Sequence, residues 1–203
     1  MKDNWTEDAL TFLGKNTLIF AFFTTLIVFL NQYLPMGATL LEKVKGHKII
    51  IVLPVVATLA FNFFALTFLV AAGSLLALFF ALFFGSAVLV HLLLKTSETK
   101  DKLFETVKAS FYSSRVILFM LVPILFLYPV KKGIFTFSVF MLIYCIAYLC
   151  STVSFYWLLN LAAARNYPGK KSWLITAVPI LIITIAGLFF ALKFLPKMAP
   201  LIS

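Results

Sequence analysis

The chain has 203 residues, of which 63% are apolar and only 12% are charged, and its mean hydropathy is +1.08. Soluble domains have about 45–50% apolar and about 25% charged residues, so the composition excludes a water-soluble fold and predicts an all-α, polytopic transmembrane helix bundle. The net charge of +10 is carried by short loops beside apolar stretches, which favours contact with anionic lipid head groups over nucleic acid.

The first apolar stretch, Thr17–Leu34, approaches the roughly 20 residues that a membrane-spanning helix needs. The polar segment before it is typical of a helix start, because Asn4 can cap the helix and Glu7 is at the third helical position. Trp5 suits a membrane interface. A cleaved signal peptide is the alternative interpretation. It is disfavoured because the leading region carries three acidic residues and no small-residue cleavage site follows before Lys43.

A basic loop, Pro35–Lys48, separates this span from 46 residues without a Lys, Arg, Asp or Glu, Ile49–Leu94. That length exceeds one span and predicts two, joined in a tight hairpin near Ala71–Ser74. The second arm of the hairpin carries a small residue at every fourth position, which favours close helix packing in lipid. The stripe consists of Gly73, Ala77, Ala81 and Gly85.

The most charged stretch, Lys95–Lys108, follows. Helical spacing places four apolar residues on one face, which predicts an amphipathic helix lying on the membrane surface. These residues are Leu103, Phe104, Val107 and Phe111. An ordinary solvated linker helix is the alternative.

Three more spans complete a predicted set of about six. The fourth, Tyr112–Pro129, contains Pro123, which should kink or open it. The fifth, Ile134–Ala163, is long and is expected to tilt or to extend into the interface. The sixth is Trp173–Leu195. The domain division expected from this pattern is an N-terminal segment of residues 1–48 and a membrane domain of residues 49–203.

The basic residues predict an orientation. Eleven Lys and Arg residues fall in or next to loops 35–48, 95–108 and 164–171, and six fall on the other side of the predicted spans. Because basic loops stay in the cytoplasm, the three loops are predicted to be cytoplasmic and both termini to lie outside a cell membrane.

No Asp or Glu lies inside any predicted span, which argues against a proton-coupled or sodium-coupled carrier. His91 has no second histidine, cysteine or acid nearby in sequence, so it is a poor metal ligand. Cys145 and Cys150 are expected to be buried free thiols. With no nucleophile–base pair and no phosphate-binding loop, the sequence predicts no enzyme, no catalytic residue, no metal and no cofactor.

The fifth predicted span is the most polar. Steps of four residues give a slowly turning polar stripe on one helix side. The stripe predicts either hydrogen bonds between helices or the lining of a polar groove. The candidate groove residues are Asn62, Tyr144, Tyr148, Thr152, Tyr156 and Asn160.

Four basic residues are candidates for contact with a lipid phosphate: Arg115, Arg165, Lys170 and Lys171. Arginine matches phosphate well because its guanidinium can donate two parallel hydrogen bonds. For Arg115, at the start of the fourth span, the alternative is a side chain that extends to the interface without a specific ligand.

Three segments carry a family resemblance in order: His91–Lys95 at the end of the charge-free run, Phe104–Ser114 after the polar loop, and Tyr167–Pro168 after the long fifth span. Over about 150 residues from Ile49 onward, the chain resembles the Yip1 domain family, as a prokaryotic member. Two features depart from the family pattern, namely Arg115, where a small residue or proline is common, and the additional N-terminal span.

The resemblance implies a five-span core and a non-enzymatic scaffold, membrane-organising or trafficking-type function. The eukaryotic members bind small GTPases through an N-terminal region that has no counterpart here. The expected partners are membrane lipids and either other membrane proteins or further copies of the chain, and no nucleic acid. The alternative function is a small carrier, or the membrane subunit of a transporter or larger complex.

Overall fold

The computed structural model describes residues 5–44, 48–94 and 102–168, and close to the C-terminus residues 181–182, 184–189, 192–194 and 197. Within these residues every regular element is a helix. Four helices are long and apolar enough to cross a membrane: Asp8–Glu42, Val52–Leu94, Leu103–Lys131 and Phe137–Asn166. The prediction of an all-helical chain with membrane-spanning helices is confirmed, whereas the count of about six spans is not.

The first rod comprises α1 (Trp5–Val28), a π-helical turn η1 (Phe29–Tyr33) and α2 (Leu34–Glu42). The helix therefore continues through the segment that was expected to be a loop from Pro35. Proline is tolerated there because it lies in the first turn of α2. Pro35 has no N–H for the carbonyl of Asn31 four residues earlier, and the Lys131 ammonium donates to that carbonyl instead, at 2.9 Å.

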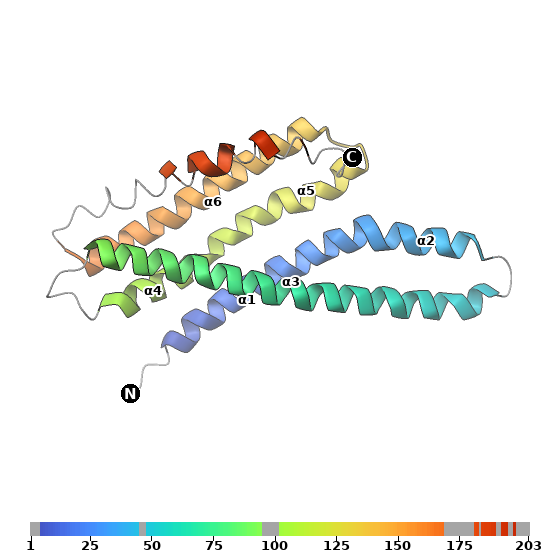
Figure 1. The fold of residues 1–203 in the computed structure, drawn as a ribbon, viewed down its shortest axis with the longest axis horizontal. Coiled ribbons are helices and arrows are strands. Elements are labelled where there is room, and N and C mark those ends of the chain that lie inside the picture. Colours follow the sequence, from blue (N-terminus) through green and yellow to red (C-terminus); the bar gives the residue numbers. More distant parts are fainter. Residues whose placement is uncertain are drawn as a thin grey trace.

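Helix α3 (Lys48–Leu94) runs for 47 residues without a break, so the predicted hairpin at Ala71–Ser74 is wrong. Alanine is the best helix former, and one glycine costs only about 1 kcal/mol, so nothing in this segment is strong enough to end the helix. At 1.5 Å per residue α3 is about 70 Å long. Its two ends therefore lie at opposite ends of the molecule (Figure 1).

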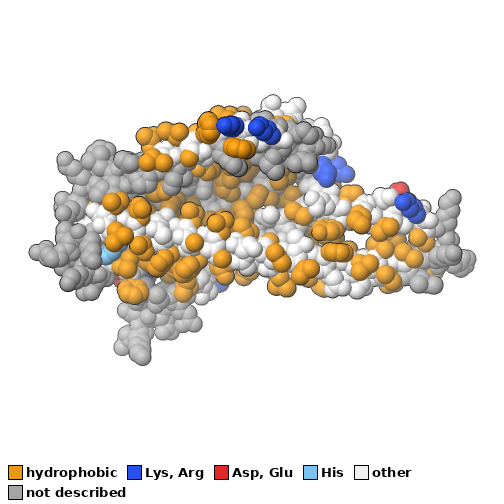
Figure 2. Space-filling model, viewed as in Figure 1, with side chains coloured by type: hydrophobic (Ala, Val, Ile, Leu, Met, Phe, Trp, Pro, Cys, Tyr) orange, Lys and Arg blue, Asp and Glu red, His pale blue; other side chains and the backbone are white. Residues whose placement is uncertain are grey.

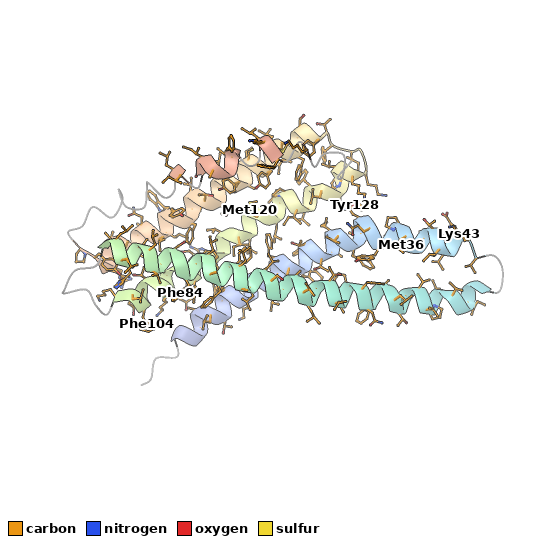
Figure 3. The ribbon with its side chains drawn as sticks, in the orientation of Figure 1. Met36, Lys43, Phe84, Phe104, Met120 and Tyr128 are labelled. Atoms are coloured by element: carbon orange, nitrogen blue, oxygen red, sulfur yellow. The ribbon has the colours of Figure 1, made fainter. Side chains whose placement is uncertain are left out.

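One consequence is a projecting arm, made of α2 and residues 48–62 of α3, which extends past the other helices (Figure 1). Its surface is strongly apolar: Ile50 is 75% exposed and Phe61 is 70% exposed. Hydrophobic side chains cover the visible face of the arm, and charged ones gather near its tip (Figure 2). Met36 and Lys43 mark α2 in Figure 3. This surface requires an apolar environment or partner.

The third rod comprises α4 (Leu103–Tyr112), a 3₁₀ segment η3 (Ser113–Met120) and α5 (Leu121–Lys131). The predicted separate amphipathic helix is instead the first part of one continuous helical segment, Leu103–Lys131, and Val107 and Phe111 of its predicted apolar face are buried against neighbouring helices. Phe104, expected on the same face, is 61% exposed. The tightened 3₁₀ segment ends just before Pro123, which agrees with the predicted disturbance of the helix by this residue.

Helix α6 (Phe137–Asn166) follows a turn in which Gly133 has φ +71°. Thr136 caps its first turn by accepting a hydrogen bond from the Val139 N–H at 3.4 Å. The sixth predicted span, Trp173–Leu195, lies mostly outside the described residues. Its described residue Gly187 lies so close to Tyr148 that a Cβ at this position would overlap the phenol. The C-terminal helical residues therefore pack against α6.

The hydrophobic core lies where α1, α3, α4, η3 and α6 meet. Phe83, which is 1% exposed, makes an edge-to-face contact with Phe155 with ring centres 5.0 Å apart. The Ser110 hydroxyl donates to the Phe83 carbonyl at 2.7 Å, so α3 and α4 approach closely. This end of the molecule contains the start of α4 and the end of α6, and is called the basic end below.

Helix α1 belongs to the same core. Asn16 donates to the Ser114 hydroxyl at 3.0 Å, and the rings of Phe12 and Tyr112 lie 5.4 Å apart. The start of α1 is therefore at the basic end, beside α4. From the sequence, the N-terminus was predicted on the opposite side of the membrane from loop 95–108, and loop 35–48 was predicted on the same side as loop 95–108. The unbroken α3 reverses both relations.

Candidate functional site

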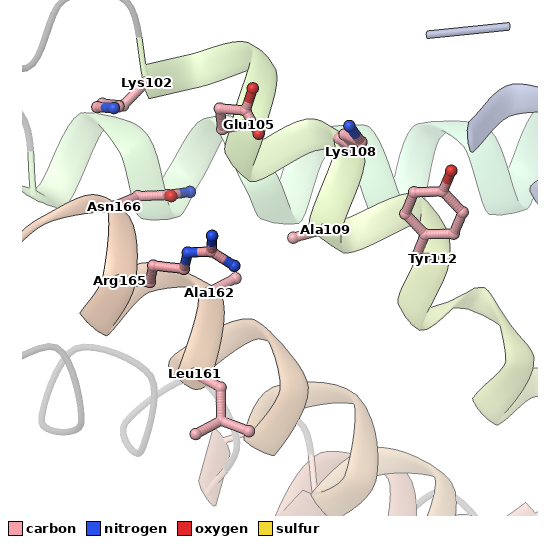
Figure 4. Close-up of a pocket in the computed structure, with 9 residues that line it drawn as sticks. All are labelled: Lys102, Glu105, Lys108, Ala109, Tyr112, Leu161, Ala162, Arg165 and Asn166. Carbon is pink, nitrogen blue, oxygen red and sulfur yellow. The ribbon is translucent and has the colours of Figure 1, made fainter. Parts of the chain in front are cut away.

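A polar groove runs between α4 and α6 at the basic end and has a volume of about 680 Å³. Its walls carry residues at helical spacing on both sides, as Figure 4 shows. The lining, here called the basic groove, consists of Lys102, Glu105, Lys108, Ala109, Tyr112, Leu161, Ala162, Arg165 and Asn166. The small side chains of Ala109 and Ala162 leave the space that the longer polar side chains surround.

The charges of the groove are unbalanced. Lys102, Lys108 and Arg165 contribute three positive charges and Glu105 one negative charge, which leaves a net charge of +2. Lys102 and Arg165 are exposed, so their charged groups can move to meet a ligand. The groove therefore favours an anion, and the planar guanidinium of Arg165 suits a phosphate or carboxylate in particular.

A buried hydrogen-bond network supports the floor of the groove. The Asn166 amide donates to Thr106 Oγ1 at 3.3 Å, and the Thr106 hydroxyl donates to the Lys102 carbonyl at 2.9 Å. The Tyr167 hydroxyl lies 3.2 Å from Thr106 Oγ1 and hydrogen-bonds His91 Nδ1 at 2.6 Å. The network fixes the end of α3, the start of α4 and the end of α6 relative to one another.

The environment of Tyr167 keeps its phenol protonated. Burial raises the pKa of Tyr167 above its usual value of 10.0, and the hydrogen bond with Thr106 offsets this only in part. At neutral pH the hydroxyl is therefore available as a donor to His91 or Thr106.

Replacing Tyr167 by phenylalanine should lower the free energy of unfolding by about 1–3 kcal/mol, because buried Thr106 and His91 each lose a partner. Reversible unfolding in mixed detergent micelles measures this change. Tyr33→Phe is the matched control, since the Tyr33 ring stacks on Phe63 with centres 5.5 Å apart, and this contact survives loss of the hydroxyl. Equal stabilities of the two variants would contradict a structural role for the network.

Only part of the predicted polar groove is brought together. Tyr144, Tyr148, Thr152 and Tyr156 line one cavity of about 500 Å³ between α3, η3 and α6. Asn62 is exposed on the projecting arm. Asn160 does not line the cavity, and its buried side-chain oxygen has no hydrogen-bond partner among the described residues. The cavity also receives side chains from α1 and α3, which the periodicity of α6 alone could not indicate.

The predicted phosphate-contacting residues also separate. Arg165 lines the basic groove, whereas Arg115 is exposed on η3 and lies outside it. Lys170 and Lys171 lie outside the described residues. Three further residues of the groove were not predicted from the sequence, namely Lys102, Lys108 and Asn166. The first two lie in the charged stretch Lys95–Lys108, which was predicted on the same side of the membrane as segment 164–171, but its helix was expected to lie on the membrane surface and not to pack against α6.

The two cysteines differ from expectation in burial. Cys145 is half-buried and Cys150 is exposed on the outer side of α6, so only the first approaches the predicted buried state. Within the described ranges, no three His, Cys, Asp or Glu residues lie close enough together to hold a metal ion.

No protein-family model, curated protein or solved structure matches this chain.

Proposed function

We propose that the protein is a non-enzymatic, multi-pass membrane protein of the Yip1-like type, which organises the membrane by holding anionic lipid head groups at its basic end. The observation that carries the proposal is the basic groove, with its three cations, one carboxylate and open space between α4 and α6. The apolar arm supports it, because an exposed apolar helix pair provides contact area for other membrane proteins.

Two belts of aromatic and basic residues define the proposed position of the bilayer. The first belt consists of Lys15, Tyr112, Arg115 and Trp157, and the second of Tyr33, Tyr128, Lys131 and Lys132. Aromatic and basic residues of this kind concentrate at membrane interfaces. The distance between the belts is about 27 Å along the first rod, from position 15 to 33, close to the roughly 30 Å of a hydrocarbon core.

This placement puts the basic groove just outside the first belt. Arg165 is eight residues beyond Trp157 on α6, which corresponds to about 12 Å. Lipid phosphates lie in the layer outside the hydrocarbon core, within reach of lysine and arginine side chains. An anionic lipid of the adjacent leaflet can therefore place its phosphate between Lys102, Lys108 and Arg165.

The basic end is proposed to face the cytoplasm. Among the described residues up to position 168, five Lys or Arg residues lie towards that end and four lie towards the other end. An excess of basic residues marks the cytoplasmic side, where the leaflet is also anionic. The five are Lys15, Lys102, Lys108, Arg115 and Arg165.

Analysis of copurified lipids tests the proposal. The chain is purified in a mild detergent, and the ratio of anionic to zwitterionic phospholipid that it retains is compared with the ratio in the source membrane. Enrichment of anionic lipid by several-fold is expected, since each basic residue near the surface contributes about 1 kcal/mol. Retained lipid with the composition of the bulk membrane would contradict the proposal.

A small carrier is the second candidate, because the cavity between α3, η3 and α6 lies between the two belts. A carrier must move solute across a sealed bilayer, so proteoliposomes loaded with a mixture of small metabolites distinguish the two functions. The scaffold predicts loss of solute at the rate of protein-free liposomes. Faster loss that is abolished by Thr152→Leu would favour the carrier.

A further inference from the structure

The cavity between α3, η3 and α6 extends along α6 over roughly the thickness of one leaflet. Tyr144 and Tyr156 mark its two ends on α6, 12 residues or about 18 Å apart. Tyr156 directly precedes Trp157 of the first belt, which is 62% exposed, so that end lies at the interface. Tyr144 is 13 residues, or about 20 Å, from Trp157, a little beyond the midpoint of the bilayer as placed above. Half a hydrocarbon core is about 15 Å thick, which matches this extent.

The lining is neutral. Among the described residues, its ionisable groups are the three tyrosines Tyr144, Tyr148 and Tyr156, and no Lys, Arg, Asp, Glu or His of the described ranges contributes to it. A charged ligand would lose its hydration without gaining an opposite charge, so free carboxylates, phosphates and cations are excluded from this space. The apolar walls, which include Phe79, Phe83 and Met120, suit hydrocarbon.

The cavity reaches the outer surface of the bundle. Leu82 lines it and is 51% exposed, so a molecule in the surrounding lipid can enter beside α3. At about 500 Å³ the space falls within the range of about 300–1,000 Å³ that is typical of ligand pockets. At the interfacial end, the Tyr156 hydroxyl has no hydrogen-bond partner among the described residues.

We propose that this cavity binds one acyl chain of an ester lipid from the leaflet at the basic end, with its ester carbonyl accepting a hydrogen bond from Tyr156. The chain then extends along α6 towards Tyr144. The two sites are independent, because no residue lines both the cavity and the basic groove. This inference rests on the membrane placement above but not on the head-group selectivity of the groove.

A comparison of two phosphatidylcholines tests the inference. Both have the same zwitterionic head group, and they differ only in having ester or ether linkages, so the ether lipid has no carbonyl. Lipid retained by the full chain in detergent is counted by native mass spectrometry. The wild type should retain the ester lipid at least about threefold more strongly than the ether lipid, since one hydrogen bond contributes about two- to tenfold.

Three variants complete the experiment. Tyr156→Phe should remove the preference for the ester lipid, whereas Tyr128→Phe, at the other belt, should keep it. Ser86→Phe should block retention of both lipids, because it places a ring in the cavity, and the hydrogen bond that it removes joins the Ser86 hydroxyl to the Leu82 carbonyl of its own helix. The inference is overturned if Tyr156→Phe keeps the wild-type preference, or if Ser86→Phe retains as much lipid as the wild type.

Discussion

Replacing Lys102, Lys108 and Arg165 together by glutamine should weaken binding of a soluble short-chain phosphatidylglycerol by about 100-fold. Each basic residue near an anionic lipid contributes about 1 kcal/mol, and three such losses correspond to about two powers of ten in affinity. Titration of the chain in neutral detergent measures the dissociation constant. Binding of the corresponding phosphatidylcholine should change much less, because its head group has no net charge.

The matched control removes three positive charges from the opposite end, through Lys43→Gln, Lys131→Gln and Lys132→Gln. This variant has the same net charge as the groove variant, so it separates local contact from long-range attraction. It should bind phosphatidylglycerol within about threefold of the wild type, a residual effect that salt screens. Equal losses in the two variants would show that net charge, and not the groove, attracts the lipid.

Replacing Phe83 by alanine should lower the free energy of unfolding by about 3–5 kcal/mol, the range for removal of a fully buried aromatic ring. Phe83 is 1% exposed and packs on Phe155 where α3, α4 and α6 meet. In lipid, helices associate through van der Waals contact, so a cavity at this point removes the interaction that holds the bundle together.

The neighbouring residue is the natural control. Phe84 is 40% exposed and its ring stacks on Phe80 of the same helix, so Phe84→Ala should cost less than about 1 kcal/mol. The two variants remove the same group from adjacent positions of one helix. Unfolding of both in mixed micelles checks the expectation, and a similar cost at the two positions would contradict the packing described for α3.

The class of the fold could be predicted because hydrocarbon imposes a simple requirement on the backbone. Apolar stretches near 20 residues must be helical, and α6, a single uninterrupted stretch, was found within three residues at each end. Thr136, which caps it, was the feature that the hydropathy pattern could not locate.

The connectivity could not be predicted in the same way. The 46 charge-free residues from Ile49 permit two spans or one long helix, and the sequence at Ala71–Ser74 contains a weak helix breaker in Gly73 and no proline. Length alone favoured a hairpin. Helix propensity favoured continuity, and the structure follows propensity.

The candidate sites depended on contacts between distant segments. The polar stripe of α6 grouped Tyr144, Tyr148, Thr152 and Tyr156, and these residues line one cavity because they share one helix. Asn62 comes from a different helix, and the sequence did not indicate which residues of α6 it would face. It lies in α3, on the projecting arm, and is exposed. Arg165 lines the same groove as Lys102 and Lys108 because hydrogen bonds of Thr106 with Tyr167 and Asn166 hold α4 beside the end of α6.

The central claim is that this chain crosses a bilayer, with the basic groove at the cytoplasmic end and the tip of the arm on the other side. Single cysteines at Lys43 and Lys102, in a chain with Cys145→Ala and Cys150→Ala, test it through labelling by a membrane-impermeant maleimide in intact cells. The Lys43→Cys chain should be labelled at once, and the Lys102→Cys chain only after the membrane is permeabilised. Labelling of both positions from the same side would contradict the account.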